Sequence, residues 1–574
     1  MKNAKKFFLL LAPYKKQALL ALCATLVTNL LGLAFPWAIK LIIDEILSAK
    51  NSALLNWVAA GLIIVFSLKF YFGFLREYLF ALISENTVLD LRNKLYWHLQ
   101  RLSVSYVENT PTGRIISGII GDVESIRKFL FGGAIDFAYS FFTFFFVLSI
   151  LFFINFKLTL ISLIYLPAFS LVFLKLSPRL GQKQAFVRQK YAELTARLNE
   201  VFNGIRVVSG FAKEEYEAGW FDSKQKEIVK ASLASERLGI FLWMMSEFFS
   251  SLGLVTLIWF GAKEVFLGRL SPGALMAFYS YLGMLFFPVI KMVVINNYYQ
   301  EASAALARID RVLAEEPGIK ETAKTLRPSK IRGDIKFAGV SFAYDNRKAA
   351  LSGINLEVKE AEVVALAGKS GSGKSTIINL LLRFYEPKEG AIYIDGYGLK
   401  ELELKYYRSR VAMVLQDDYL FSGTVRENIL YGNPGAGMAA VKAAARSANA
   451  EEFISSLPRG YDTEIGERGI KLSFGQRQRL SIARAILREP DILILDEATS
   501  CVDSETERLI IEEAFRKLMA GRTTFIISHR ISSVIYADKI VFIEKGRIVE
   551  SGSHLELLGQ KGSYWRMWLE QTVR

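Results

Sequence analysis

A glycine-rich segment, GKSGSGKST, occupies residues 368–376 and carries residue types that bind phosphate. It follows the apolar run 363–367 and precedes the apolar run 377–381, so we expect a buried strand, a turn and the start of a helix. Glycine lets main-chain N–H groups approach phosphate oxygens, and a helix N-terminus adds partial positive charge there. Lys374 would reach the β- and γ-phosphates, and Ser375 would ligate Mg²⁺. The segment therefore predicts a nucleoside triphosphate site.

Two acidic residues end another apolar run in the same half of the chain. Residues 492–495 predict a buried strand that closes with Asp496 and Glu497. One carboxylate there can hold Mg²⁺, and its neighbour can orient or deprotonate an attacking water, although such a pair can also be structural. His529 follows the apolar run 524–527. Because ligands bind at the carboxyl ends of parallel strands, we expect His529 at the same sheet edge as Asp496.

Six apolar stretches in the first half reach or approach the length needed to cross a bilayer. Five lysines precede the first stretch, which places the N-terminus in the cytoplasm. The first stretch is too long for a signal peptide and lacks a cleavage site. Six crossings then return the chain to the cytoplasm, where the nucleotide-binding half must lie. The stretches are approximately 17–43, 53–80, 129–154, 158–180, 239–262 and 273–298.

The connections between these stretches are unequal in length. Those predicted outside are short, whereas those predicted inside, 81–128 and 181–238, are long and charged with little Pro or Gly. We interpret the inner ones as helices that extend beyond the bilayer and turn at their tips, for example at 109–113, where they could transmit force. Solvated loops are the alternative interpretation.

Charged residues within the apolar stretches need an explanation, because each is costly in a bilayer. Lys40 and Asp44 lie four residues apart and can pair on one helix. Four others are predicted towards the inner leaflet. They indicate either a polar cavity for an amphipathic substrate or structural pairing between helices; the four are Lys69, Asp136, Glu247 and Lys291.

The net charge of +15 fits either a nucleic-acid-binding protein or a membrane protein with basic cytoplasmic flanks. The apolar stretches favour the membrane protein, and we expect no nucleic acid partner. The two cysteines, Cys23 and Cys501, share no motif, so a disulfide framework is excluded.

Further motifs follow the phosphate-binding segment in a fixed order: VAMVLQDD at 411–418, KLSFGQRQRLSIARA at 471–485, DILILDEATSCVD at 491–503 and FIISHR at 525–530. This ordered set resembles the ATP-binding cassette transporters. Six spans ahead of one cassette resemble the exporter branch that includes multidrug exporters and the lipid A flippase. The resemblance implies a six-helix α-helical transmembrane domain of the type I exporter (type IV) fold over 1–311, a linker over 312–332, and an α/β P-loop nucleotide-binding domain over 333–574.

The resemblance also implies roles for single residues. Tyr344 corresponds to an aromatic residue that stacks on adenine, and Gln416 to one that touches Mg²⁺ and senses the membrane domain. Asp496 would support Mg²⁺, Glu497 would be the general base, and His529 would contact the γ-phosphate. Asp503 would lie in a loop that crosses to a partner cassette. The expected phosphate-binding residues are Gly368, Lys369, Ser370, Gly371, Ser372, Gly373, Lys374, Ser375 and Thr376.

A signature sequence in this family closes over ATP bound to a second cassette, and Ser473, Gly475 and Gln476 match it. A dimer is therefore implied. Phe474 replaces the usual first glycine of the signature; because Ser473 and Gly475 carry the expected phosphate contacts, we expect function to survive. Since Glu497 and the histidine at 529 are both present, a homodimer is the simpler expectation, with a heterodimer as the alternative.

These observations together predict a multi-pass cytoplasmic-membrane protein that uses ATP and Mg²⁺ to export or flip hydrophobic or amphipathic compounds by alternating access. Small cationic drugs and a native lipid or lipid-linked product are the two substrate classes. An ATP-gated channel or regulatory receptor is the alternative of another kind, and the presence of Glu497 disfavours it. The apolar spans argue against a soluble cassette protein.

Overall fold

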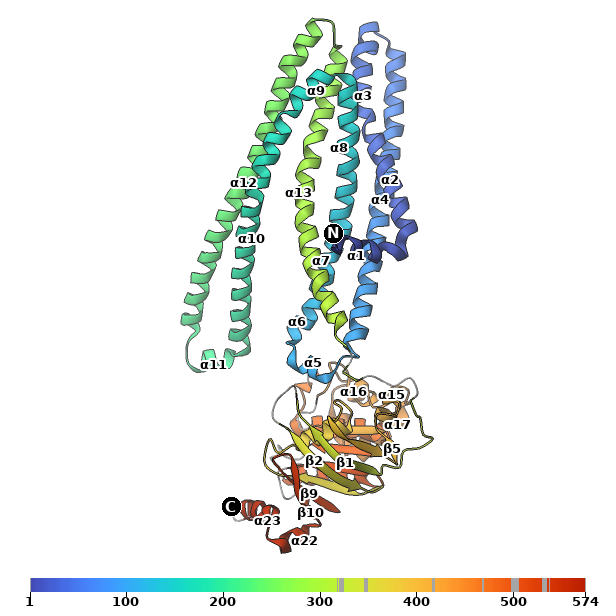
Figure 1. The fold of residues 1–574 in the computed structure, drawn as a ribbon, viewed down its shortest axis with the longest axis vertical. Helices are drawn as coiled ribbons and strands as arrows, with labels where there is room; N and C mark the ends of the chain where they lie inside the picture. The colour runs from blue at the N-terminus through green and yellow to red at the C-terminus, as the bar shows by residue number, and fades with distance from the viewer. Residues whose placement is uncertain are drawn as a thin grey trace. The chain divides into compact units, whose positions relative to one another are not determined.

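The computed structural model describes residues 2–316, 318–319, 325–344, 349–415, 419–466, 469–496, 505–528, 534–535 and 537–572. The chain forms two compact units (Figure 1). The first consists of Met1–Gln100 with Thr112–Glu315. The second consists of Arg101–Pro111 with Glu316–Arg574, so a short segment from the first half of the chain belongs to the second unit.

The first unit is a bundle of long helices. Its longest elements are α2 (Lys15–Gly32), which continues through α3 (Ala34–Leu41) and η2 (Ile42–Leu47), α4 (Ser52–Leu99), α8 (Ala134–Ile154), α9 (Phe156–Leu163) followed by α10 (Tyr165–Asn203), α12 (Glu214–Phe266) and α13 (Pro272–Ala314). Shorter elements are α1 (Lys2–Leu11), η1 (Ala12–Tyr14), α6 (Thr112–Ser117), η3 (Gly118–Asp122), α7 (Val123–Lys128), η4 (Phe129–Gly133) and α11 (Ile205–Gly210).

Four helical segments among the described residues are long and apolar enough to cross a membrane: Leu9–Leu47, Ser52–Leu99, Thr112–Ile154 and Glu214–Phe266. They contain the first, second, third and fifth predicted spans. The fourth, 158–180, lies in α9 and α10, where the helix is interrupted at Ile164 and becomes charged from Lys175 onwards. The sixth, 273–298, lies within α13.

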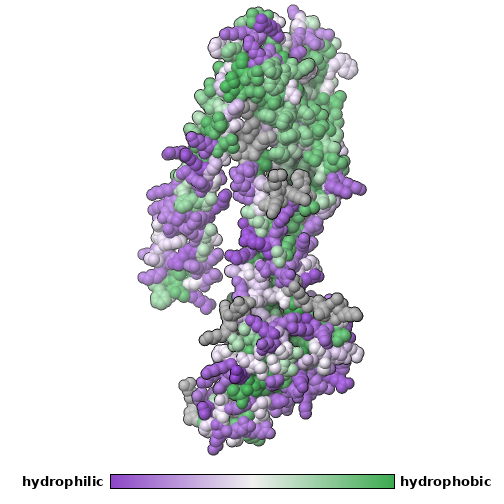
Figure 2. Space-filling view, in the orientation of Figure 1, coloured by the Kyte–Doolittle hydropathy of each residue, from purple (hydrophilic) through white to green (hydrophobic). Residues whose placement is uncertain are grey.

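Helices of the bundle pack in pairs: α2 against α4, α8 against α13, and α10 against α12 (Figure 1). Side chains of α13 such as Phe278 and Leu282 are fully buried and share a core with Val147 and Leu151 of α8. In Figure 2, hydrophobic side chains cover the upper part of this unit, whereas hydrophilic ones cover the lower part of the α10–α12 hairpin. Such an apolar surface fits a hydrocarbon environment.

Asp44 anchors η2 to the start of α13. Its carboxylate accepts hydrogen bonds from the Ser271 hydroxyl and from the Gly273 main-chain N–H, the latter at 2.8 Å. Lys40 Nζ lies 3.7 Å from the same carboxylate, so the predicted pairing of Lys40 with Asp44 is confirmed. Because a carboxylate with several donors tolerates burial, this contact fixes the helix ends without leaving a bare charge.

The second unit is an α/β domain built on a six-stranded sheet. Its strand order is β10-β9-β3-β8-β7-β6, and all neighbours pair in parallel except β10 with β9. The strands are β3 (Val363–Ala367), β6 (Val411–Val414), β7 (Ile492–Asp496), β8 (Thr523–Ile527), β9 (Lys539–Glu544) and β10 (Arg547–Gly552). A second, antiparallel sheet has the order β2-β1-β4-β5, with β1 (Ile335–Phe342), β2 (Leu351–Val358), β4 (Glu389–Ile394) and β5 (Tyr397–Gly398).

The six-stranded sheet is buried on both faces. Along β3, Val364 and Leu366 enter one core cluster, whereas Ala365 and Ala367 enter another. An uninterrupted apolar strand is what this double burial requires. In the antiparallel sheet, β1 has irregular register near Gly339 and ends at Phe342.

The helices of the second unit complete the domain. They are α5 (Val104–Asn109), α14 (Lys374–Leu381), α15 (Leu404–Ser409), α16 (Val425–Leu430), α17 (Met438–Ser447), α18 (Glu451–Ser456), η5 (Gly460–Asp462), α19 (Phe474–Leu487), α20 (Glu505–Met519), α22 (His554–Gln560) and α23 (Ser563–Thr572). Within this set α5 comes from the first half of the chain, and Leu102 just before it is buried.

An ion pair between Asp122 and Arg308 joins η3 to α13. The guanidinium binds both carboxylate oxygens, with Nη2 to Oδ1 at 2.6 Å and Nε to Oδ2 at 3.0 Å. The Asp122 side chain is only 12% exposed, whereas that of Arg308 is 51% exposed. A two-pronged contact of this kind is stronger than an ordinary surface pair.

We predict that Arg308→Ala lowers the free energy of unfolding by about 1–3 kcal/mol, because it leaves the buried carboxylate of Asp122 unpaired. Arg311→Ala is the matched control, since Arg311 is exposed on the same helix and donates only to the carbonyl of Ala307 in the described structure. Melting curves in lipid nanodiscs measure the difference. Equal losses in both variants would show that the pair does not stabilise the fold.

Candidate functional site

The parallel strands bring the predicted nucleotide-binding residues to one edge of the sheet. In register, Leu366 of β3 lies beside Ile527 of β8, and Leu495 of β7 lies beside Ile526. These three strands therefore end together. The phosphate-binding segment follows β3, Asp496 closes β7, and β6 ends beside β7. This edge is the expected place for a ligand in such a sheet.

The glycine-rich turn after β3 has a backbone that other residues do not readily adopt. Gly368 has φ of +143° and Gly373 has φ of +112°. A side chain at Gly368 would collide with the carbonyl oxygen of Ile543 in β9, and one at Gly373 would lie 2.7 Å from Cδ2 of Leu351. The glycines are therefore required by the tight path of the chain as well as by access for a ligand.

Polar groups converge inside this turn. Lys374, which is 8% exposed, begins α14 and donates from Nζ to the carbonyls of Gly368 and Lys369 at 2.8 and 3.0 Å. Ser372 is buried, and its hydroxyl is recorded without a hydrogen-bond partner in the described structure. Ser375 is exposed at the same helix start. A buried ammonium, an unsatisfied hydroxyl and a helix N-terminus together fit a phosphate group.

Tyr344 lies two residues beyond the end of β1 and is held near the phosphate-binding turn. Its hydroxyl donates to Oγ1 of Thr376 at 3.3 Å and accepts from Nδ2 of Asn379 at 3.2 Å, so it contacts α14 directly. The residue is half-buried. This position is consistent with a base bound beside the phosphates, because the ring and the turn belong to one local cluster.

The signature residues form the start of α19. The Ser473 hydroxyl accepts from the Gln476 main-chain N–H at 3.2 Å, and the Gln476 side chain accepts from the Ser473 N–H at 2.9 Å. This reciprocal cap leaves the first helical N–H groups, those of Phe474 and Gly475, pointing out of the helix end. Phe474 is half-buried, with the Arg477 guanidinium 5.9 Å from the centre of its ring.

Four predicted site residues lie outside the described residues: Gln416, Glu497, Asp503 and His529. Asp496 is described at the end of β7 and is partly buried. Among the described residues there is no group of three or more His, Cys, Asp or Glu side chains that could hold a metal ion by themselves. A magnesium site made of Ser375, Asp496 and a nucleotide phosphate does not need such a group.

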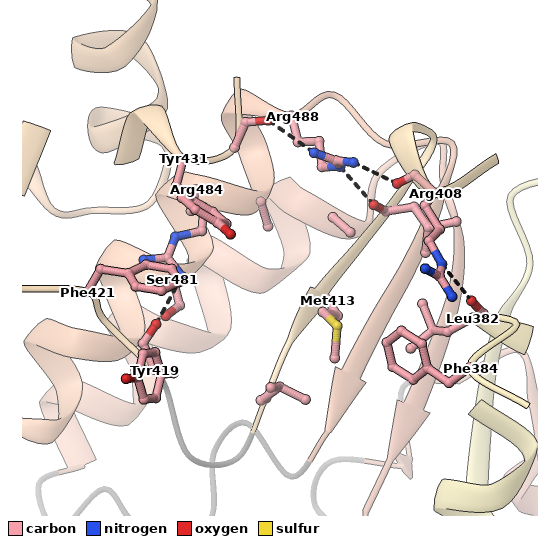
Figure 3. A pocket seen from close by; sticks show the side chains of 15 residues that line it. Leu382, Phe384, Arg408, Met413, Tyr419, Phe421, Tyr431, Ser481, Arg484 and Arg488 are labelled. Carbon is pink, nitrogen blue, oxygen red and sulfur yellow. Dashed lines mark hydrogen bonds between the residues drawn. The ribbon is translucent and has the colours of Figure 1, made fainter. Parts of the chain in front are cut away.

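A separate cavity of about 400 Å³ lies along β6, and Figure 3 shows its lining. Its walls combine aromatic side chains with arginines whose donors reach main-chain carbonyls. Arg488 binds the carbonyls of Arg408 and Val411, and Arg408 binds that of Leu382. Burial lowers the pKa of Arg488, but an arginine remains charged at neutral pH. The phosphate-binding turn contributes no residue to this lining.

The predicted polar residues of the helical unit fall into two groups. Asp136 of α8 and Lys291 of α13 form an ion pair, with Nζ to Oδ2 at 2.8 Å. This contact favours structural pairing for these two residues. Lys69 of α4 lies over the ring of Phe66 at 5.9 Å and close to Gly32, whereas Glu247 is exposed on α12.

Sequence reasoning missed two contacts that the fold creates. The Asp122–Arg308 pair was not predicted, because the two residues lie 186 positions apart and no local pattern links them. Tyr385 was also missed; it lies in the segment between α14 and β4 and contacts Tyr344 ring to ring. No periodic pattern marks Tyr385, because it follows the helix in a short irregular segment.

Comparison with known proteins agrees with this architecture. The family model described as ABC transporter transmembrane region matches residues 18–289, and the one described as ABC transporter matches residues 351–500. A Staphylococcus aureus protein named as a multidrug export ATP-binding/permease protein is 38% identical, over 99% of this chain and 100% of its own. The ATP-dependent lipid A-core flippase of Syntrophus aciditrophicus is 34% identical, over 98% and 93% respectively. The solved structure of a bacterial Atm1-family ABC exporter with ATP bound has a TM-score of 0.81 and 28% identity, covering 97% of this chain and 98% of that one.

The chain belongs to the ATP-binding cassette transporters. The predicted exporter fold, a helical transmembrane domain followed by a nucleotide-binding domain, is confirmed. The protein is therefore a membrane protein that binds ATP and couples its hydrolysis to export. Because this fold carries one cassette per chain, it works as a dimer.

We predict that Gly373→Ala weakens ATP binding by about tenfold to a hundredfold. An alanine at a φ of +112° strains the backbone, and the phosphate-binding turn must move to relieve that strain. Gly521→Ala is the matched control. Gly521 also has positive φ, at +71°, but a side chain there meets no atom within 4 Å and lies far along the chain from the turn. Titration with a fluorescent ATP analogue measures both. Equal affinity losses would mean that general strain, not the phosphate site, is responsible.

Proposed function

We propose that the chain forms a homodimer in the cytoplasmic membrane and uses ATP hydrolysis to export or flip hydrophobic or amphipathic compounds. The observation that carries this proposal is the phosphate-binding turn, with Lys374 and Ser372 buried in it, in a cassette that follows a helical bundle with an apolar surface. The names of the multidrug exporter and lipid flippase relatives support the choice of substrate classes.

Each cassette residue has a proposed role in this activity. Residues 368–376 hold the phosphates, and Tyr344 stacks on adenine. Glu497 draws a proton from the attacking water, and His529 contacts the γ-phosphate. Bound Mg²⁺ neutralises charge on the phosphates, and Ser375, Gln416 and Asp496 are the residues that would hold it.

The dimer completes each nucleotide site. Ser473, Gly475 and Gln476 lie at the capped start of α19, whose outward N–H groups suit a phosphate of ATP on a second chain. We propose that Asp503 also lies towards that chain. The presence of Glu497 and His529 in this chain makes a homodimer the simpler arrangement; a heterodimer with another half-transporter is the alternative.

We also propose the domain limits 1–311, 312–332 and 333–574, with the N-terminus and the cassette in the cytoplasm. The basic residues before the first span support this orientation. In this orientation the cassette binds ATP from the cytoplasm.

The substrate classes are small cationic amphiphiles and lipids. We propose a polar cavity that includes Lys69, Asp136, Glu247 and Lys291. Because Asp136 and Lys291 neutralise each other, Lys69 and Glu247 supply the charge that a substrate would meet. Their opposite signs suit zwitterionic or mixed amphiphiles.

The direct test uses the purified chain alone in proteoliposomes. ATP hydrolysis is measured against a panel of cationic amphiphiles and lipid extracts, together with ATP-dependent movement of a labelled substrate. Stimulation and movement by one class would support the homodimer and identify its substrate. ATP-dependent ion currents without substrate movement would instead support a channel.

We predict that Glu497→Gln lowers ATP hydrolysis by at least about a hundredfold, because a positioned base contributes that much or more. ATP binding should persist, because the substitution keeps the size of the side chain. Turnover and fluorescent-nucleotide titration are measured on the same preparation. Substantial residual hydrolysis would remove Glu497 from the role of base.

We predict that Asp136→Lys or Lys291→Asp alone lowers thermal stability and basal ATP hydrolysis, because each places two like charges together between α8 and α13. The double variant with both changes should restore both quantities, since it restores the pair in reverse. Melting curves and hydrolysis rates in nanodiscs provide the comparison. Failure of the double variant to recover either quantity would contradict a pairing role.

A further inference from the structure

Three aromatic rings form a cluster beside the phosphate-binding turn. Tyr344 and Tyr385 meet edge to face, with ring centres 5.1 Å apart at 85°. Phe342 closes the triangle, at 4.8 Å from Tyr344 and 5.5 Å from Tyr385. Phe342 is buried, and the two tyrosines are half-buried. The Tyr385 ring therefore contributes to the orientation of the Tyr344 ring, because aromatic pairs favour an edge-to-face arrangement.

Tyr385 also contacts the segment that comes from the first half of the chain. Its hydroxyl donates to Oε2 of Glu108 on α5 at 3.2 Å. Glu108 and Tyr385 belong to the same compact unit, so this contact lies within one body. Leu102 is buried at the start of the same segment, and Ser103 packs against Gly318, which holds α5 in place.

The hydroxyl of Tyr385 remains protonated under ordinary conditions. Burial, together with the neighbouring Glu108 carboxylate, raises the pKa of Tyr385 to about 12. The group is therefore a hydrogen-bond donor throughout the neutral range, and replacing it with phenylalanine removes one donor without changing charge. The Tyr344 hydroxyl is engaged separately, with Thr376 and Asn379 of α14.

We propose that Tyr385 is a positioning residue for ATP binding: it holds the Tyr344 ring in the orientation that stacks on adenine, and Glu108 of α5 holds Tyr385. This inference rests on the proposed role of Tyr344. A continuous path then runs from α5 through Glu108, Tyr385 and Tyr344 to α14, so a shift of α5 changes the affinity for ATP. Of the hydrogen bonds and ring contacts described for Glu108 and Tyr385, none reaches the phosphate-binding turn directly, so both act through Tyr344.

Single substitutions separate the ring of Tyr385 from its hydroxyl. Tyr385→Ala removes both and should raise the KM for ATP by about 2- to 10-fold, the range of an aromatic pair, while kcat stays within about twofold. Tyr385→Phe keeps the ring and should raise KM by about 2- to 5-fold through the lost hydrogen bond. Glu108→Ala should match Tyr385→Phe, and Glu108→Gln, which keeps an acceptor oxygen, should restore the original KM.

The decisive experiment is the double variant Glu108→Ala with Tyr385→Phe in the full chain in nanodiscs. If the carboxylate and the hydroxyl act only through each other, its KM equals that of either single variant. Val107→Ala on α5 and Tyr397→Phe on β5 are the controls, because each trims an exposed side chain that lies outside the aromatic cluster. The proposal would be overturned if the fold-changes in KM multiply in the double variant. It would also be overturned if Tyr385→Ala leaves KM unchanged, or if the controls change KM as much as the test variants do.

For each variant, the dissociation constant of a fluorescent ATP analogue is also compared with that of the unmodified chain. This second readout keeps the test independent of turnover. If the unmodified chain binds the analogue but does not hydrolyse ATP, the proposed transport activity fails, whereas the binding ratios still decide the role of Tyr385. If Tyr344→Ala leaves binding unchanged, both the adenine role of Tyr344 and the positioning role of Tyr385 are rejected.

Discussion

The backbone of one turn is the constraint on which the cassette depends. Between β3 and α14 the chain passes so close to β9 and to Leu351 that side chains at Gly368 and Gly373 would collide. The same turn brings the Lys374 ammonium inward, where carbonyl oxygens surround it. The parallel sheet and the two apolar cores that cover its faces hold the ends of β3, β7 and β8 at the same edge as this turn. Phosphate binding at this sheet edge thus depends on the packed sheet that holds the turn in place.

Much of the cassette could be predicted because its signals are local. A glycine-rich turn between an apolar strand and a helix has few alternatives, and Asp496 at a strand end identifies the same sheet edge as the turn. The order of the motifs then identified the family and its exporter fold. Outside the cassette, element limits were less certain: the predicted span 158–180 is divided between α9 and α10, with an interruption at Ile164.

Contacts between distant residues could not be predicted. Glu108 and Tyr385 are 277 positions apart, and nothing in either local sequence specifies the other. In the bundle, composition placed Asp136 and Lys291 at similar depth, but the rotation of each helix about its axis decides whether they meet. Helix rotation depends on packing of many apolar side chains, such as Phe278 against Val147, and no short pattern encodes it.

The assignment of residues 101–111 to the second unit has a consequence for how the protein is made. The polypeptide passes between the two units three times, at 100–101, 111–112 and 315–316. Synthesis therefore delivers α5 roughly two hundred residues before the rest of the second unit, so the contact between Glu108 and Tyr385 forms only after the cassette is made. A fragment that starts at residue 316 therefore lacks Glu108 and its hydrogen bond to Tyr385.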